Sequence, residues 1–162
     1  MTLQELKDKI EYICLQHIAI NNFAYGKEFD IMGDVTHQYP MAFLELPYAL
    51  TYYPEQQQYK GINFALMFLF SPKQDSVPEQ HVGISNADQI ADAIIARLQN
   101  ELYGTVLFTN IVSVSLSEYT AEDLSGVRVE FVGRMQRVTN SNINCYENYF
   151  KDLGNIPNDK FS

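Results

Sequence analysis

The sequence has no tryptophan, only two cysteines and no long apolar run. Cys14 and Cys145 are too few for a disulfide framework, which favours folding in a reducing, intracellular environment. The longest apolar run, INFALMFLF, has the length of a strand and falls short of the ~18 residues that a membrane span needs. The N-terminus is polar and lacks the basic and apolar regions of a signal peptide. We therefore expect a protein that neither spans nor binds a membrane.

Basic residues are scarce as well. The chain has 11 Lys and Arg against 20 Asp and Glu, which gives a net charge of −9. Binding to a phosphate backbone depends on Lys and Arg displacing counterions, so this balance disfavours a nucleic-acid-binding protein. Two interpretations of the acidic surplus remain open: it keeps the protein soluble, or it lines a channel that DNA passes without binding.

Motifs for catalysis and cofactor binding are scarce too. Gly26 and Gly33 are isolated, so no glycine-rich phosphate loop is present. Cys14 and His17 lie on adjacent turns of a predicted helix, but no second pair completes a zinc site. We interpret them as a small buried residue and a residue suited to the negative end of the helix dipole. Other candidates that we interpret as solvated loop or turn residues are His37, His81, Glu118, Glu122 and Asp123. We expect no enzyme, metal or cofactor.

The strongest pattern that is present runs from residue 111 to 136. Two alternating segments, IVSVSLSE and VRVEFVGRMQ, flank the turn-rich sequence YTAEDLSG. In the first segment three apolar residues alternate with serines, and in the second Val127, Val129 and Phe131 oppose Arg128 and Glu130. The apolar set of the first segment is Val112, Val114 and Leu116, and the serine set is Ser113, Ser115 and Ser117. This pattern predicts a β-hairpin with one solvated, serine-lined face.

The N-terminal region predicts a helix. Thr2 and Glu5 form a capping box, and the helix should run to about residue 17 or 18. Its apolar stripe consists of Leu3, Leu6, Ile10, Ile13 and Ile18. Asn21, Asn22 and Gly26 end the pattern, and we expect a loop from there to Tyr39.

Three strands and a second helix are predicted next. The strands cover residues 41–46, 49–53 and 59–70, and the last is apolar on both faces, which is typical of a central strand or of one covered by another subunit. The polar segment 71–85 predicts a long arm. A capping box at Ser85 and Asp88 begins the second helix, which Gly104 should end.

These elements predict the fold class. With 162 residues and 46% hydrophobic content, the chain is expected to form one domain over residues 1–138, followed by an irregular tail over 139–162. Strands and helices do not alternate as a doubly wound fold requires. We therefore predict an α+β fold in which two helices pack on one face of an antiparallel sheet. Basic residues that we expect to pair with the acidic surplus are Lys60, Arg97, Arg128, Arg134 and Arg137.

The order of motifs resembles a known family. The amphipathic helix is followed by an LEL-type strand, the FALMFLF strand, the polar arm, an Ile/Ala-striped helix and AEDLSGVRVEF. This pattern, over residues 1–135, resembles the tail-terminator or tail-completion proteins of tailed bacteriophages. In that family two helices cover an antiparallel sheet, and a hairpin return is common. Residues that match this return are Asp123, Gly126, Val127, Val129 and Phe131.

The resemblance implies a structural virion protein at the head-tail junction. Such proteins form a homo-oligomeric ring, hexameric or in the alternative dodecameric, which joins the tail to connector or neck proteins and leaves a channel for DNA ejection. Assembly would take place in the cytoplasm of the bacterial host. Residues that we expect at subunit or partner interfaces are Phe64, Phe68, Phe70, Lys73, Val77, Val82, Arg97, Arg128, Arg134, Tyr146, Tyr149 and Phe150.

An alternative from another class is a small α+β enzyme or ligand-binding domain. Its site would lie between the loop around Asp34 to His37 and the sheet. Two helices on one face of a sheet leave the other face open, and an exposed apolar face usually recruits a partner. The sequence therefore favours oligomerisation over a monomeric enzyme.

Overall fold

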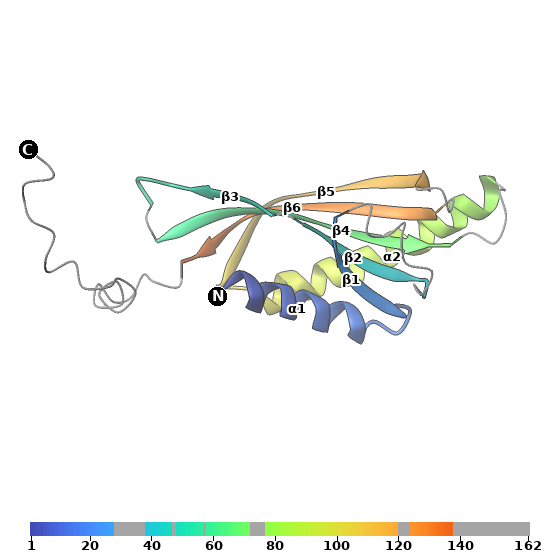
Figure 1. Ribbon diagram of the computed structural model, residues 1–162, viewed down its shortest axis with the longest axis horizontal. Coiled ribbons are helices and arrows are strands. Elements are labelled where there is room, and N and C mark those ends of the chain that lie inside the picture. The colour runs from blue at the N-terminus through green and yellow to red at the C-terminus, as the bar shows by residue number, and fades with distance from the viewer. Residues whose placement is uncertain (28–37, 47, 57, 72–76, 120–123, 138–162) are drawn as a thin grey trace, which may run out of the picture.

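The computed structural model describes residues 1–27, 38–46, 48–56, 58–71, 77–119 and 124–137. They form a mixed α+β fold with two helices and a six-stranded, mostly antiparallel sheet (Figure 1). The elements are α1 (Leu3–Gln16), β1 (Asn22–Gly26), β2 (Met41–Glu45), β3 (Ala49–Tyr52), β4 (Tyr59–Phe70), α2 (Val77–Glu101), β5 (Val106–Tyr119) and β6 (Leu124–Gln136). The predicted tail, 139–162, lies outside the described residues.

The strand order is β1-β2-β4-β6-β5, and β3 pairs with the first part of β4. All pairs are antiparallel except β1 with β2, which is parallel. The prediction of a loop after Asn21 is therefore wrong for β1. Asn22 and Gly26 are residues typical of turns, but the strand forms through its main chain, since each of its residues pairs with one of β2. A pattern of side chains cannot detect such pairing.

Both helices cover the same face of the sheet, as the sequence predicts. The buried side of α1 contributes Leu6 and Ile10, and that of α2 contributes Ile94 and Leu98, to one apolar cluster with the sheet. The strand residues of this cluster include Leu44, Ile62, Phe64, Leu66, Phe68, Val127, Val129 and Phe131. The rings of Phe64 and Phe131 stack at its centre, with their centroids 4.8 Å apart.

The opposite face holds a second, smaller apolar cluster. It consists of Met41, Phe43, Met67, Leu69 and Leu124, all of which are buried. Met67 and Leu69 alternate along β4 with the residues that face the helices, so β4 is apolar on both faces. Since β4 lies between β2 and β6, the prediction of a central strand is confirmed.

The first helix begins and ends where the sequence places it. Thr2 Oγ1 accepts a hydrogen bond from the Glu5 amide at 3.1 Å, and the Thr2 amide donates to Glu5 Oε2 at 2.6 Å. His17 caps the C-terminus in an extended conformation. The expected burial of Ile18 is wrong: its side chain is fully exposed, because the helix has already ended and the chain turns away from the core.

The second helix is longer than predicted, and it includes most of the segment 71–85 that we expected to form an arm. α2 begins at Val77, not at Ser85, so the segment 77–85 is helical. Pro78 fits there because the first turn has no intrahelical N–H bond to lose. Gly83 does not break the helix but lets it approach β6: a Cβ at Gly83 would lie 2.2 Å from Ser125 Oγ. Gly104 has a φ of 80° just beyond the helix end, as its predicted role requires.

The hairpin of β5 and β6 is confirmed, but its exposure differs from the prediction. Ser113 and Ser115 are exposed on the helix side, while Val112 and Val114 are 43% and 52% exposed on the other side. Both sides of this part of β5 are therefore open, because β5 is an edge strand beyond the cover of α2. Ser117 Oγ lies 3.3 Å from Gln80 Oε1 and ties the far end of β5 to α2.

Candidate interaction surfaces

The sheet extends beyond its helices at one end. Figure 1 shows the hairpin of β3 and β4 reaching past α1, on the side away from the start of α2. We define the distal projection as β3, residues 53–56 and 58–61 of the β3–β4 hairpin, and Arg134, Gln136 and Arg137 at or just beyond the end of β6; the neighbouring Ile62 and Met135 belong to the buried cluster. Every residue of β3 is exposed, and Tyr52 is 62% exposed. No element among the described residues covers this part of the sheet as the helices cover the rest.

Two arginines of the distal projection stack on tyrosines. The guanidinium carbon of Arg134 lies 5.3 Å from the ring centroid of Tyr53, and that of Arg137 lies 5.6 Å from Tyr52. Arg134 also donates a hydrogen bond to Gln56 Oε1 at 3.1 Å. Each contact holds a planar cation against an aromatic face and restricts its direction.

The distal projection has a charge opposite to that of the chain. It contains Lys60, Arg134 and Arg137 but one acid, Glu55, so its formal charge is 3 − 1 = +2 in a chain of net charge −9. The ion pairs among the described residues use Lys7, Lys9, Arg97 and Arg128, and none of these pairs involves Lys60 or Arg134. Lys60 and Arg134 thus take no part in these ion pairs, and the β4–β6 register places their side chains on opposite faces of the sheet.

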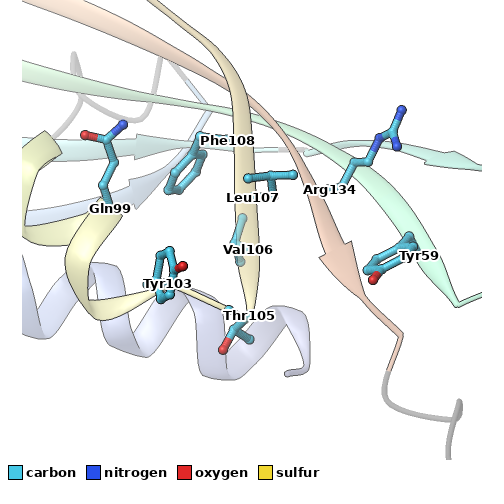
Figure 2. Close-up of a pocket in the computed structure, with 9 residues that line it drawn as sticks. Tyr59, Gln99, Tyr103, Thr105, Val106, Leu107, Phe108 and Arg134 are labelled. Carbon is cyan, nitrogen blue, oxygen red and sulfur yellow. The ribbon is translucent and has the colours of Figure 1, made fainter.

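A groove of about 580 Å³ lies where the distal projection meets the end of α2 (Figure 2). Gln99, Tyr103 and Phe108 lie on one side of the start of β5, and Arg134 and Tyr59 lie on the other. The remaining lining residues are Gly104, Thr105, Val106 and Leu107. Among the described residues that line the groove, Arg134 is the only charged one, and none carries a carboxylate, thiol or imidazole for proton transfer.

Arg128 is the centre of an ion-pair network on the face without helices. Its Nε and Nη2 atoms lie 2.6 and 2.7 Å from the two carboxylate oxygens of Glu45, and its Nη1 atom contacts Glu130. The hydrogen bonds to Glu45 raise the pKa of Arg128. The network borders a hollow of about 240 Å³ around Ala65 and joins β2 to β6 across the central strand. The predicted pairing of Arg128 with acids is confirmed, as is that of Arg97, which pairs with Glu101 at 2.8 Å.

Asp88 and Asp92 form an acidic flank on α2. With about 3.6 residues per turn, positions 88, 92 and 99 lie on one side of the helix, and Gln99 lines the groove beside β5. The acidic flank therefore lies on the β5 side of α2, whereas Arg97 lies on the α1 side, where Glu101 also pairs with Lys9. Both aspartates are exposed, and neither takes part in an ion pair among the described residues.

The structure separates the residues predicted at interfaces into distinct groups. Phe64 and Phe68 are buried beneath the helices, so they build the core and not an exposed surface. Phe70 is half-buried at the edge of the same cluster. Val77 and Val82 are exposed on α2. Expected interface residues that lie outside the described residues are Lys73, Tyr146, Tyr149 and Phe150.

The cysteine of α1 is buried, and the histidine that follows the helix is its C-cap residue. Cys14 is fully buried, and burial raises the pKa of its thiol to about 12. His17 Nδ1 accepts a hydrogen bond from the Ala19 amide at 3.2 Å. Over the described ranges, no three His, Cys, Asp or Glu side chains come together as metal ligands. His81, expected in a loop, is an exposed residue of α2. The alternative site between the Asp34–His37 loop and the sheet falls outside the described ranges.

The distal projection is the surface that sequence reasoning missed. Tyr52 and Tyr53 lie in a short segment without clear alternation, Lys60 lies at the start of the apolar strand predicted over 59–70, and Arg134 is far from all three in the chain. Pairing of β4 with β6 brings Lys60 opposite Met135 and Gly61 opposite Arg134. Around the polar EQQQ turn the sequence has one acid, Glu55, and one base, Lys60, so no basic excess is visible there; the excess arises only when β6 pairs with β4.

Neither described helix is both long enough and apolar enough to cross a membrane. Comparison with protein-family models gives no match for this chain, and comparison with curated proteins gives none either.

Proposed function

We propose that this chain is a ring-forming structural protein at the head-tail junction of a tailed bacteriophage, a tail-terminator, tail-completion or neck protein. In this role it joins the tail to the connector and leaves a channel for DNA. It acts by assembly, without a cofactor, and resides in the virion after assembly in the host cytoplasm. The two-helix sheet is compatible with this role, and the resemblance of residues 1–135 is what suggests it.

The observation that carries the proposal is the presence of two different uncovered surfaces on one subunit. One is the edge strand β5, whose valines and serines are exposed on opposite sides. The other is the distal projection, which no helix covers. A closed ring with rotational symmetry requires a heterologous contact, in which two different patches of identical subunits meet. A subunit with a single self-complementary patch would form a dimer instead.

The charge of the chain supports the proposed channel for DNA. In a ring, −9 is repeated for every subunit, and acidic residues that face the lumen repel the phosphates of passing DNA. Such a lumen gives passage without binding. The acidic flank of α2 and the half-exposed Glu130 network are candidates for this role or for subunit contacts.

A second candidate function is the binding of a small ligand in the groove of Figure 2. Its volume of about 580 Å³ and its aromatic residues, Tyr59, Tyr103 and Phe108, suit an apolar or aromatic molecule. The lining residues of the groove lie on both sides of the start of β5, and Arg134 among them belongs to the distal projection that the ring proposal uses. We therefore rank ligand binding below assembly.

The test is a mass measurement on the full chain. Light scattering and native mass spectrometry from micromolar to millimolar concentration should detect a closed oligomer, and negative-stain electron microscopy should show rings with a central hole. The same measurement is repeated with the purified products of adjacent genes, since some junction proteins assemble only on their partners. A strict monomer under all of these conditions would contradict the proposal.

A further inference from the structure

The outer edge of β5 is the longest strand edge left unpaired among the described strands. β5 pairs with β6 on one side and with no described strand on the other, so every second residue directs its N–H and C=O groups outward. Its pairing with β6 is regular from Asn110 to Leu116, between two register shifts. Soluble proteins usually protect such an edge with charged residues or proline. The sequence has neither between Val106 and Ser117, so this edge is unprotected.

The strand β3 has a second free edge, on the opposite side of the sheet. Among the described strands it pairs only with β4, and β4 separates it from β6. All four residues of β3, Ala49–Tyr52, are exposed, and none is charged. β1 also ends the sheet on this side, but four of its five residues are half-buried. β3 is therefore the more accessible of these two edges.

We propose that the outer edge of β5 in one copy pairs with β3 of a second copy, so that the sheets of neighbouring subunits join by strand addition. The inference rests on the proposed function, because it names the two patches that meet at each contact of the ring. The contact is heterologous: every subunit uses β5 on one neighbour and β3 on the other.

Strand direction favours β3 over a second β5 as the partner. β3, β4, β6 and β5 are neighbours in this order, and each is antiparallel to the next, so β3 and β5 run in opposite directions. Rotation about an axis along the strands preserves these directions. β5 therefore meets β3 of the next copy in the antiparallel sense, and the alternation continues across the contact. Pairing of β5 with a second β5 requires a two-fold axis and would end in a dimer.

The register of the sheet indicates which residues meet. The row of paired residues through Thr51 reaches β5 at Leu107. A closed sheet is staggered by about one residue per strand when strand number and shear are equal, so four strands shift the row by about four residues along β6, to that of Val112. Thr51 of the second copy then opposes Val112, and Leu50 opposes Ser113. Each pair is uncharged and shares a face, so the helices of both copies lie on one side of the joined sheet.

The experiment is a double-variant cycle in the full chain, read by sedimentation velocity and native mass spectrometry under the conditions in which the parent assembles. Ser113→Lys places an ammonium group on the edge of β5, and Leu50→Glu places a carboxylate on β3. Each variant alone should associate at least about tenfold more weakly than the parent, because an unpaired charge is buried at every contact. The double variant pairs Lys with Glu at every contact and should recover most of that loss.

The matched control is Ser85→Lys, the same substitution at an exposed position of α2. It should leave association unchanged, and circular dichroism with thermal melting checks that every variant is folded. Single variants that assemble as the parent does would overturn the pairing of β5 with β3 and leave the ring intact. A loss with Ser113→Lys that Leu50→Glu does not share would overturn β3 as the partner and favour a second β5. A parent that never assembles, alone or with the products of adjacent genes, would overturn the proposed function as well.

Discussion

The same sheet has a covered part and an uncovered part, and the two differ in almost every property. Beneath the helices, Leu66 is 0% exposed and sits among aromatic and aliphatic neighbours; on the distal projection, Leu50 is 37% exposed on the same side of the sheet. The covered part forms ion pairs within the chain, whereas Arg134 of the projection stacks on a tyrosine. The covered part and the projection have only their strand pairing in common.

This difference shows that hydrogen bonding and burial act separately in this molecule. β3 and β4 pair through four residues in regular register although their side chains in β3 are exposed. The stability of the fold must therefore come mainly from the covered part, where apolar area is removed from water. The projection is free to serve association, since little of the core depends on it.

The largest expected effect is a difference in stability loss when the same substitution, Leu→Ala, is made in the covered part of the sheet and on the projection. Leu66→Ala should lower the free energy of unfolding by about 3 kcal/mol, because it leaves a cavity beneath the helices. Leu50→Ala, the same change on the projection, should cost less than about 1 kcal/mol. Urea unfolding followed by circular dichroism measures both. Equal losses would show that the projection is part of the stabilising core.

A pair of glycines gives the next comparison. A Cβ at Gly126 would lie 1.9 Å from the Phe68 carbonyl oxygen, so Gly126→Ala forces β6 away from β4 and should cost about 2 kcal/mol. At Gly61 the nearest atom, 2.7 Å away, is the hydroxyl of Tyr53, the end of a side chain that can move. Gly61→Ala should therefore cost less than about 1 kcal/mol. Thermal melting of the two variants decides, and a larger loss at Gly61 would contradict the comparison.

Capping of α1 gives a smaller effect. Thr2→Ala removes the side-chain acceptor for the Glu5 amide and should lower the free energy of unfolding by about 1 kcal/mol. Thr51→Ala, at an exposed position of β3, is the control and should stay within about 0.5 kcal/mol of the parent. Chemical denaturation resolves this difference, and an unaffected Thr2→Ala would mean that α1 is held by packing alone.

The smallest effect is a pH dependence. Hydrogen bonding to Lys9, with help from Arg97, lowers the pKa of Glu101 below its ordinary value of 4.5. The unfolded chain thus binds the proton first as pH falls, so the stabilisation is complete above 4.5 and is lost as pH decreases toward the folded-state pKa. Glu101→Gln should flatten this part of the stability curve. Glu55→Gln on the projection is the control and should keep the parent's pH dependence of stability. If the parent and Glu101→Gln showed the same pH dependence, the assignment of this effect to Glu101 would be contradicted.

Much of the covered part could be predicted from the sequence. The capping box of Thr2 and Glu5 and the two-sided apolar pattern of β4 are local signals, and both are confirmed. The parallel strand β1 and the early start of α2 could not be predicted, because each depends on a neighbour. β1 forms on the main chain of β2, and Gly83 is favoured in the helix by its approach to Ser125.

The candidate surfaces were less predictable than the core. The sequence identified Arg134 as a basic residue near the sheet, but its contact with Tyr53 requires the register of β4 and β6 and the return of β3. Phe64 and Phe68 were expected at an interface because both faces of β4 are apolar. The helices cover them instead, since α1 and α2 pack on that side of the sheet.

By itself, the sequence determined the class of fold, the two helices, the central strand and the acidic surplus, because periodicity, caps and charge are properties of the chain. Tertiary structure alone decided which part of the sheet the helices leave uncovered and which basic residues gather there. The reason is physical: exposure and charge clustering arise from strand register and helix length, which join residues that lie far apart in the chain.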